Sequence, residues 1–249
     1  EKKAVNKVVE PTNEEIDAHV DQLVAKAQVA LSKFEEFTQE QVDYIVAKCS
    51  VAGLDAHGTL AEAAVNETGR GVFEDKAVKN LFACEYVTSN LRHLKTVGII
   101  NEDPLLGITE IAEPVGVVCG IVPTTNPTST VIFKSLICLK TRNPIIFSFH
   151  PSAHACSVMA AVVIRDAAIA AGAPEDCIQW LDLKSMYATT ALMKHPGVAT
   201  ILATGGNAMV AAAYSCGKPA LGVGAGNVPA YVEKTCVLPR AVNDIVLSK

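Results

Sequence analysis

Five short apolar runs from residue 115 onward constrain the fold of this chain more than any other feature. They cover residues 115–122, 145–149, 178–181, 200–203 and 230–232, and Val and Ile are frequent in them. The runs are apolar at nearly every position, which is the pattern of parallel strands buried on both faces of a sheet. Apolar stretches of helical character separate most of them, and such alternation is typical of an α/β fold. We therefore expect a parallel sheet covered by helices.

Helical signals dominate the first 96 residues. Thr12 with Glu15, and Thr38 with Gln41, have the spacing of capping boxes, in which two side chains satisfy free N–H groups at a helix start. Further helices are expected over 60–66 and 76–94. This part of the chain is therefore predicted to be a helical cap or arm.

Residues 97–114 have the pattern of a β-hairpin, with strands at 97–100 and 108–112 and a polar turn at 101–104. Hairpins of this kind often pair with another subunit. The predicted organisation is therefore a helical region over 1–96, an oligomerisation-type hairpin over 97–114 and a ligand-binding α/β domain over 115–249. Within that domain, a helix over 152–171 is expected to be capped by Ser152 and to end before Gly172.

Composition excludes several classes of function. The chain has 249 residues, half of them hydrophobic, which is enough to bury a large core. Its net charge of -5 provides no basic surface for nucleic acid, so a small-molecule partner is expected. The eight cysteines are scattered without a C-x-x-C pair, as in reduced intracellular proteins. The sequence has no uninterrupted apolar run of about 18 residues and no signal-like start, so we expect a cytoplasmic protein that does not enter a membrane.

Ligands of parallel α/β sheets bind at the carboxyl ends of the strands, and one unusual turn follows the first run there. Pro123 and Pro127 brace a polar triplet that ends in Asn126, ahead of a helix that Thr128 is expected to cap. A rigidly held Asn amide is suited to stabilising an oxyanion that forms when a nucleophile attacks a carbonyl. The alternative is that Asn-Pro is simply a good turn dipeptide.

Two glycine-rich turns follow later runs. Gly205 and Gly206, in 203–207, would let the backbone approach a pyrophosphate at the start of the next helix, although two glycines also suit an ordinary turn. The alternating glycines of 222–227 indicate close approach to a flat ring, or alternatively a bulged strand or crossover. His150 and His154 are four residues apart, but Pro151 argues against one shared helix, so no metal site is expected.

Taken together, these turns resemble those of the coenzyme-A-acylating aldehyde dehydrogenases. The resemblance is carried by AEPVGVVCGIVPTTNPTST at 112–130, with FKSL at 133–136 and KTRN at 140–143. More narrowly, ILATGG at 201–206 and GVGAGN at 222–227 are similar to the aldehyde dehydrogenase half of the bifunctional aldehyde-alcohol dehydrogenases of fermenting microbes. The similarity extends over nearly the whole chain.

The resemblance implies an aldehyde-dehydrogenase-like Rossmann-type domain that binds NAD and serves the interconversion of acetaldehyde, coenzyme A and NAD⁺ with acetyl-CoA and NADH. It implies that Asn126 donates to the oxyanion and that His150 lies near the adenosine ribose, while the choice between NAD and NADP stays open. The implied cofactor-binding residues are Ile121, Val122, Pro123, Thr124, Thr125, Asn126, Gly205, Gly206 and Gly224.

The resemblance also implies that parts of the enzyme lie outside this chain. The nucleophilic cysteine of the family would fall beyond Lys249, and none of the eight cysteines matches it, so the chain alone is expected to be inactive. Iron would belong only to a C-terminal alcohol dehydrogenase domain absent from this chain. The full-length protein is expected to form a homo-oligomer or filament.

One position separates acylating from hydrolytic relatives. Val223 stands where hydrolytic aldehyde dehydrogenases carry a water-activating Glu, which favours acyl transfer to a thiol such as coenzyme A. Two alternatives remain at this point. One is a hydrolytic aldehyde dehydrogenase or a related phosphate-activated reductase, and the other is a non-catalytic assembly module built on the helical region and the hairpin.

Overall fold

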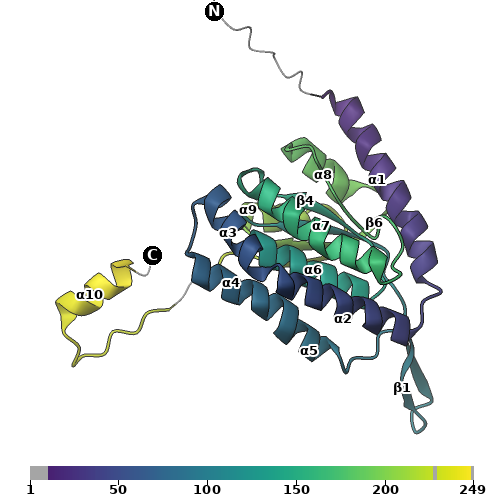
Figure 1. The fold of residues 1–249 in the computed structure, drawn as a ribbon, viewed down its shortest axis with the longest axis horizontal. Coiled ribbons are helices and arrows are strands. Elements are labelled where there is room, and N and C mark those ends of the chain that lie inside the picture. The colour runs from purple at the N-terminus through teal and green to yellow at the C-terminus, as the bar shows by residue number, and fades with distance from the viewer. Residues whose placement is uncertain (1–10, 227–228, 248–249) are drawn as a thin grey trace, which may run out of the picture.

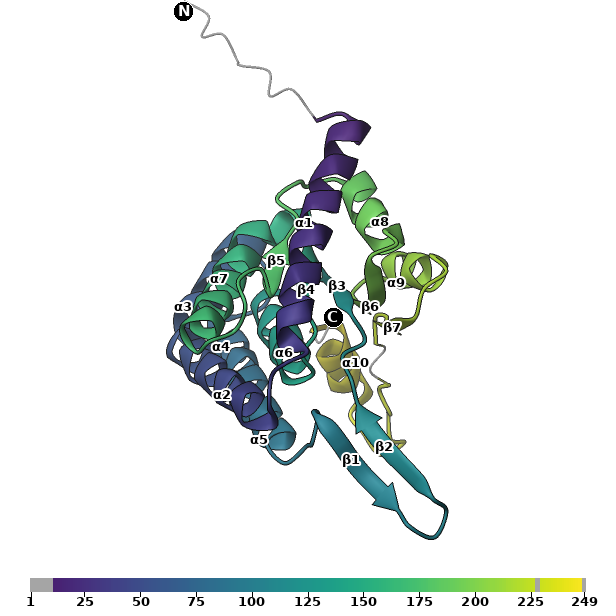
Figure 2. The same cartoon turned by 90° about the vertical axis from the view of Figure 1, so that its right-hand side faces the viewer.

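The computed structural model describes residues 11–226 and 229–247. These residues form a five-stranded parallel sheet between two layers of helices, and a two-stranded hairpin extends from one end (Figures 1 and 2). The strand order is β5-β4-β3-β6-β7, which confirms the predicted α/β fold with a parallel sheet. The strands are β3 (Val117–Val122), β4 (Ile145–Phe149), β5 (Ile178–Trp180), β6 (Val198–Thr204) and β7 (Ala220–Val223).

Burial on both faces explains the continuous apolar runs. In β3, Val118 and Val122 belong to one apolar cluster, whereas Val117, Cys119 and Ile121 belong to another on the opposite face. Successive side chains of a strand point to opposite faces, so a strand covered on both faces must be apolar at each position.

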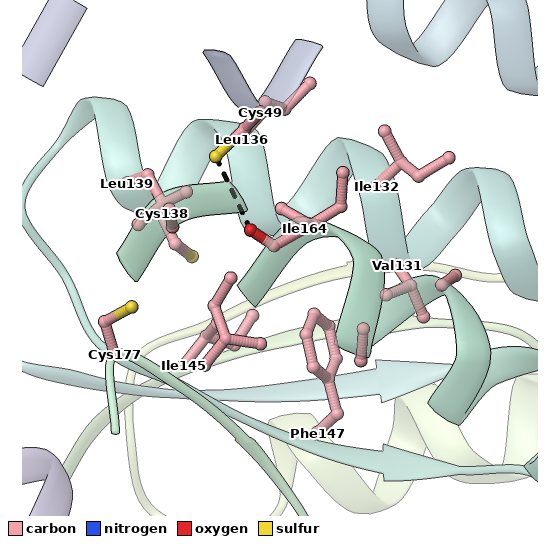
Figure 3. Packing of buried hydrophobic residues seen from close by; sticks show 14 of the residues in the cluster. Cys49, Val131, Ile132, Leu136, Cys138, Leu139, Ile145, Phe147, Ile164 and Cys177 are labelled. Atoms are coloured by element: carbon pink, nitrogen blue, oxygen red, sulfur yellow. Dashed lines mark hydrogen bonds between the residues drawn. The ribbon is translucent and has the colours of Figure 1, made fainter. Parts of the chain in front are cut away.

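One face is covered by α6 (Pro127–Lys140) and α7 (His154–Ala170), with α2 (Gln39–Asp55), α3 (His57–Thr68) and α4 (Phe73–Leu81) packed outside them (Figure 2). Figure 3 shows the centre of this layer, where Cys49 of α2 donates to the Ile164 carbonyl of α7 at 3.6 Å, above Ile145 and Phe147 of the sheet. The predicted capping box of α2, between Thr38 and Gln41, is confirmed.

The other face is covered by α1 (Asn13–Phe34), α8 (Met186–Lys194) and α9 (Asn207–Tyr214) (Figure 2). The predicted capping box of Thr12 and Glu15 starts α1, whose Ile16, Val20 and Val24 are buried in the cluster on this face. The helices of residues 1–96 therefore pack into both layers around the sheet. The division of the chain at residues 97 and 115 stays a prediction.

The expected strand over 230–232 is wrong, and the last strand of the sheet is β7 instead. A Cβ on Gly222 would lie 2.7 Å from Val210 and 2.8 Å from the Tyr214 ring, so a glycine here lets α9 pack directly on β7. Close packing of α9 on the strand thus explains the first glycine of the 222–227 run. Residues 230–232 lie exposed without a partner strand in the described chain, and Tyr231 is 89% exposed.

The hairpin is present, but its turn lies three residues later than expected. Its strands are β1 (Gly98–Asp103) and β2 (Ile108–Ala112). The Asp103 carboxylate accepts from the N–H groups of Leu105 and Leu106 at 2.9 and 3.0 Å, and Gly107 has a φ of 65°. An Asp side chain and a left-handed glycine therefore define this turn, rather than the Asn101–Pro104 segment.

Ser152 does not cap α7 as expected. A 3₁₀ turn (Pro151–Ala153) precedes the helix, and the carboxylate of Glu67 from α3 accepts from the N–H groups of Ala155 and Cys156 at 2.9 and 2.7 Å. Partial burial opposes ionisation of Glu67, but the hydrogen bonds from Cys156 and Ala155 outweigh it and hold the pKa of Glu67 below its ordinary value. Gly172 follows the helix with a φ of 102°, as predicted.

Two further helical features differ from the sequence expectation. The segment expected as one helix over 76–94 is divided into α4, a π turn (Phe82–Tyr86) and α5 (Val87–Leu91). The helical segment Pro151–Ala170 is long and apolar enough to cross a membrane by length and composition. Its Ala160, Ala161 and Ile164 are buried against the sheet layer, so core packing accounts for that composition.

The described chain ends with the exposed helix α10 (Leu238–Leu247), set apart in Figure 1.

Candidate functional site

The three turns singled out by the sequence lie on one rim of the sheet. They follow β3, β6 and β7, which are neighbouring parallel strands, so their carboxyl ends meet at the same edge. The Gly205 N–H donates to the Val223 carbonyl at 3.3 Å, and the Ala225 N–H donates to the Asn207 side chain at 3.1 Å. Asn227, the last residue of the third turn, lies outside the described residues.

A pocket of about 270 Å³ opens at this rim. It lies where the chain order reverses, because β4 and β5 follow on one side of β3 while β6 and β7 lie on the other. Such switch points are the usual ligand sites of doubly wound sheets. The walls come from the ends of β3, β4 and β6 and the turns after them, from the segment that leads into α8, and from α8 and α9. They consist of Ile121, Val122, Pro123, Ser148, Phe149, His150, Pro151, Leu183, Lys184, Ser185, Met186, Thr189, Thr204, Gly205, Gly206 and Met209.

The predicted cofactor residues divide between this pocket and its surroundings. Ile121, Val122, Pro123, Gly205 and Gly206 line the pocket. The other four predicted residues do not, and they are Thr124, Thr125, Asn126 and Gly224. The roles assigned to all nine by resemblance stay predictions.

The start of α9 has the features of an anion site. Gly206 is the N-cap residue of α9 and makes no side-chain capping bond, so free N–H groups at the helix start face the rim. No heavy atom lies within 4 Å of a Cβ built on Gly206, which leaves open space above the helix start. Gly205 has a φ of 143°, a conformation that favours glycine. In the neighbouring turn, the Thr124 hydroxyl is buried without a partner among the described residues, so a donor is available there.

Gly224 is explained by a contact within the protein. A Cβ at this position would lie 2.6 Å from the side-chain oxygen of Asn207. The absence of a side chain therefore lets Asn207, at the start of α9, hold the third turn against the second. The predicted approach of Gly224 to the nicotinamide is neither required nor contradicted by this contact.

The far end of the pocket has an imidazole and an ammonium group. The Nδ1 atom of His150 accepts from the Ser152 N–H at 3.2 Å, so the other ring nitrogen, Nε2, stays available toward the pocket wall. Lys184 lines the same end, and no Asp or Glu is among the wall residues in the described chain. A carboxylate on the adenosine ribose is the usual mark of NAD preference, so this wall does not select NAD over NADP by that means.

Asn126 lies at the edge of a second cavity, which shares no lining residue with the first. It is the N-cap residue of α6, and Pro127 occupies the first turn. The Asn126 Oδ1 atom accepts from Lys79 Nζ at 2.9 Å, while Lys76 Nζ donates to the Thr125 carbonyl at 2.8 Å. The expected cap from Thr128 is wrong, because its hydroxyl donates instead to Asn80 Oδ1 at 2.8 Å.

The second cavity has a volume of about 560 Å³ and mostly apolar walls. Its aromatic side chains come from the π turn and from α6. Its lining residues are Val78, Lys79, Phe82, Ala83, Val87, Asn126, Ser129, Thr130 and Phe133. Sequence reasoning identified only Asn126 among them, because 47 residues separate it from Lys79 and no local pattern links α4 to this turn.

The cysteines of the described chain are not placed for nucleophilic catalysis. None of them lines either cavity, and six are buried. Burial raises the pKa of the thiols of Cys84, Cys119, Cys138, Cys156 and Cys177 to about 12. A thiol with so high a pKa holds its proton at neutral pH and is a poor nucleophile.

Lys134 is a further residue that the sequence did not single out. Its ammonium lies beneath the pocket and donates to the carbonyls of Ile121 in β3 and Leu202 in β6, both at 2.6 Å. The side chain is 1% exposed, and burial lowers its pKa to about 7. Lys134 therefore ties together the two strand ends that flank the switch point.

The buried Lys134 predicts a pH-dependent contribution to stability. The folded protein releases the Lys134 proton near pH 7, whereas the unfolded chain keeps it up to the ordinary value of 10.5. The unfolded state then binds more protons between these values, so stability rises with pH across this range. From pH 7 to 9 we expect Lys134 to add about 2 kcal/mol to the free energy of unfolding.

Urea unfolding of the wild type and Lys134→Met at pH 7 and 9 measures this contribution. Buried cysteines lower stability at high pH in both proteins, so the difference between them isolates Lys134. Lys26→Met, at an exposed position on α1, should behave as the wild type. Equal pH responses of the wild type and Lys134→Met would show that Lys134 stays charged when folded.

Comparison with known proteins gives consistent matches. Residues 2–249 match the model of the aldehyde dehydrogenase family. The chain is 71% identical over 236 residues to aldehyde-alcohol dehydrogenase 2 of Entamoeba histolytica, covering 94% of this chain and 27% of that protein. It superposes on an acetylating aldehyde dehydrogenase from Geobacillus thermoglucosidasius with a TM-score of 0.88 and 46% identity, covering 97% of this chain and 53% of that one.

A third match carries a ligand. A propionaldehyde dehydrogenase of Rhodopseudomonas palustris, solved with bound propionyl-CoA, has a TM-score of 0.77 and 33% identity, covering 98% of this chain and 52% of that one. This chain thus spans about a quarter of the Entamoeba protein and about half of each solved chain.

Proposed function

This chain belongs to the aldehyde dehydrogenase family, and from that premise we propose that it is the cofactor-binding part of a coenzyme-A-acylating acetaldehyde dehydrogenase. The whole protein would be a bifunctional aldehyde-alcohol dehydrogenase, and its Entamoeba relative is named an aldehyde-alcohol dehydrogenase. The reaction would interconvert acetaldehyde, coenzyme A and NAD⁺ with acetyl-CoA and NADH. The observation that carries the proposal is the pocket at the switch point, which ends on the uncapped start of α9.

A dinucleotide fits the residues of this rim. The open space above Gly206 and the free N–H groups of α9 suit the pyrophosphate, and the apolar wall from Ile121 to Pro123 suits the flat part of the cofactor. When bound, the nicotinamide would supply the hydride acceptor for aldehyde oxidation. Because the pocket has no carboxylate at its far end, the proposal extends to NADP as an alternative cofactor.

Asn126 would take part in the attack on the carbonyl carbon of the aldehyde. A cysteine thiolate beyond Lys249 would attack the aldehyde, and the side-chain amide of Asn126 would donate to the resulting oxyanion. The adjacent apolar cavity of about 560 Å³ would hold the short aldehyde chain. Loss of a hydride from this adduct, for which the nicotinamide would be the acceptor, would leave an acyl thioester on the cysteine. The thiol of coenzyme A would then take the acyl group and release the cysteine, consistent with a bound propionyl-CoA in the Rhodopseudomonas relative.

A glycine substitution tests the cofactor site in the chain itself. Gly206→Val should weaken NADH binding at least about tenfold, because the side chain would fill the space above the helix start that the pyrophosphate needs. Its fold should be unaffected, since no neighbouring atom lies within 4 Å and its φ is an ordinary -66°. NADH fluorescence titration measures the affinity, and thermal unfolding checks the fold.

Gly58→Val is the matched control, because Gly58 also has no atom within 4 Å of an added Cβ and lies in α3, away from the rim. It should bind NADH like the wild type. Undiminished NADH affinity in Gly206→Val, or no NADH binding by the wild type, would contradict the proposed cofactor site.

A further inference from the structure

We propose that Lys79 is a positioning residue that turns the Asn126 amide so that its nitrogen, and not its oxygen, faces the reacting carbonyl. This inference rests on the proposed oxyanion role of Asn126. Lys79 Nζ lies 2.9 Å from Asn126 Oδ1, and both side chains line the second cavity. A lysine ammonium carries donors and no acceptor, so only the oxygen end of the amide can face it. The amide nitrogen is thereby directed away from Lys79. It donates one N–H to the Thr125 hydroxyl at 3.4 Å, which leaves its second N–H for the carbonyl.

The local structure at Asn126 supports the positioning role of Lys79, because the Asn126 side chain does not make the usual capping bond of an N-cap asparagine. Asn at the N-cap usually accepts through Oδ1 from a backbone N–H of the first helical turn. At α6 no such side-chain capping bond is made, and Oδ1 instead accepts from Lys79. The lysine thus replaces the helix start as the partner of the amide oxygen.

The helix α4, which carries Lys79, is fixed to the turn of Asn126 by residues on both sides of Lys79. Lys76, one turn earlier, is 5% exposed and donates to the Thr125 carbonyl. Asn80 is 1% exposed, accepts from the Thr128 hydroxyl and donates to the His57 carbonyl at 2.9 Å. Positions three and four apart lie on one face of a helix, so α4 presents a set of contacts to this turn. Lys79 is therefore held in register with Asn126, although its own side chain is exposed.

The pairing has a chemical consequence for the oxyanion site. The positive charge of Lys79 beside the amide oxygen polarises the amide and makes its N–H groups better donors. It also adds positive potential to a mostly apolar cavity at the point where negative charge would develop. Lys79 would therefore act on the developing oxyanion through Asn126.

A double-mutant cycle tests this coupling in a polypeptide that carries this chain together with the catalytic cysteine. Lys79→Met should lower kcat for coenzyme-A-dependent acetaldehyde oxidation about 10- to 100-fold, as expected for a misplaced catalytic group, with KM for NAD⁺ unchanged. Lys79→Arg should recover most of kcat, because the guanidinium also donates to an amide oxygen. In an Asn126→Ala background, Lys79→Met should cause no further loss. Lys26→Met is the control for removal of an exposed lysine and should keep full activity.

The outcomes separate this inference from the proposed function. If Asn126→Ala is strongly impaired and Lys79→Met either has wild-type kcat or adds its full loss on top of Asn126→Ala, the inference is overturned and the oxyanion role stands. If Asn126→Ala keeps full kcat, the oxyanion role fails and the positioning role with it. Thermal unfolding of each variant confirms that the comparison is made between folded proteins.

Discussion

Gly120→Val is expected to lower the free energy of unfolding by about 3 kcal/mol, the largest loss of stability expected from a single added side chain in this sheet. Gly120 lies in β3, opposite Phe147 of β4. A Cβ there would lie 2.8 Å from Phe147 Cδ1 and 2.9 Å from Ile145 Cδ1. Both neighbours are fully buried, and the Phe147 ring stacks on Phe149, with ring centroids 5.6 Å apart. The ring therefore cannot move aside without displacing other core side chains.

Urea unfolding measures this loss, and two variants sharpen the interpretation. Gly58→Ala, in open space in the first turn of α3, should stabilise the protein by no more than about 0.5 kcal/mol, because the penalty for glycine in a helix is reduced at the helix start. Phe147→Leu in the Gly120→Val background should recover part of the stability if the clash is with the ring. A Gly120→Val protein within about 0.5 kcal/mol of the wild type would show that β3 and β4 can separate to accept the side chain.

Gly120 also illustrates which parts of the fold the sequence could predict. The apolar runs and the capping boxes are local patterns, and they correctly indicated the parallel sheet and the starts of α1 and α2. The glycines were harder to interpret, because the reason for each lies on another element. Gly222 lies within β7, and its lack of a side chain makes room for Tyr214 of α9. The last strand was expected over 230–232 instead.

Caps supplied from a distance were missed for the same reason. Glu67 caps α7 from 88 residues away in sequence, and Ser152 was the nearer and wrong candidate. A capping residue next to its helix can be read from spacing, whereas one that arrives through tertiary packing cannot. The hairpin turn was misplaced because Asp103 and Gly107 favour a turn over 104–107 more strongly than the polar segment before them.

The candidate site was predictable to the extent that its residues lie in the strand-end turns. Parallel strands bring their carboxyl ends to one edge, so the three turns were expected to meet there. The first two line one pocket, and the third is hydrogen-bonded to the second without lining the pocket. The residues that support those turns come from helices elsewhere in the chain. Lys79 and Lys76 reach the first turn from α4, and Lys134 reaches it from the buried face of α6. No spacing rule relates these lysines to the strand ends they contact.

Asn126→Ala is expected to have the largest effect on catalysis, lowering kcat for acetyl-CoA formation roughly 10²- to 10³-fold in a polypeptide that includes the catalytic cysteine. The substitution removes a donor aimed at the oxyanion, which exists only along the reaction path. The resemblance places Asn126 among the cofactor-binding residues, but Asn126 does not line the pocket at the switch point, so we expect the affinity for NADH to stay the same. The fold should also be kept, since the Asn126 side chain is not used to cap α6 and Pro127 starts the helix without it.

The comparison of kcat with cofactor affinity decides between a catalytic and a structural role for Asn126. An amide that only shaped the turn would, when removed, loosen Pro123 as well and weaken NADH binding together with kcat, because Pro123 belongs to the same turn and lines the pocket. Asn126→Asp provides a second test at nearly constant size. Its carboxylate could still accept from Lys79 but could not donate to an oxyanion, so it should be at least as impaired as Asn126→Ala. Near-normal activity in Asn126→Asp would mean that the oxyanion is stabilised by other donors.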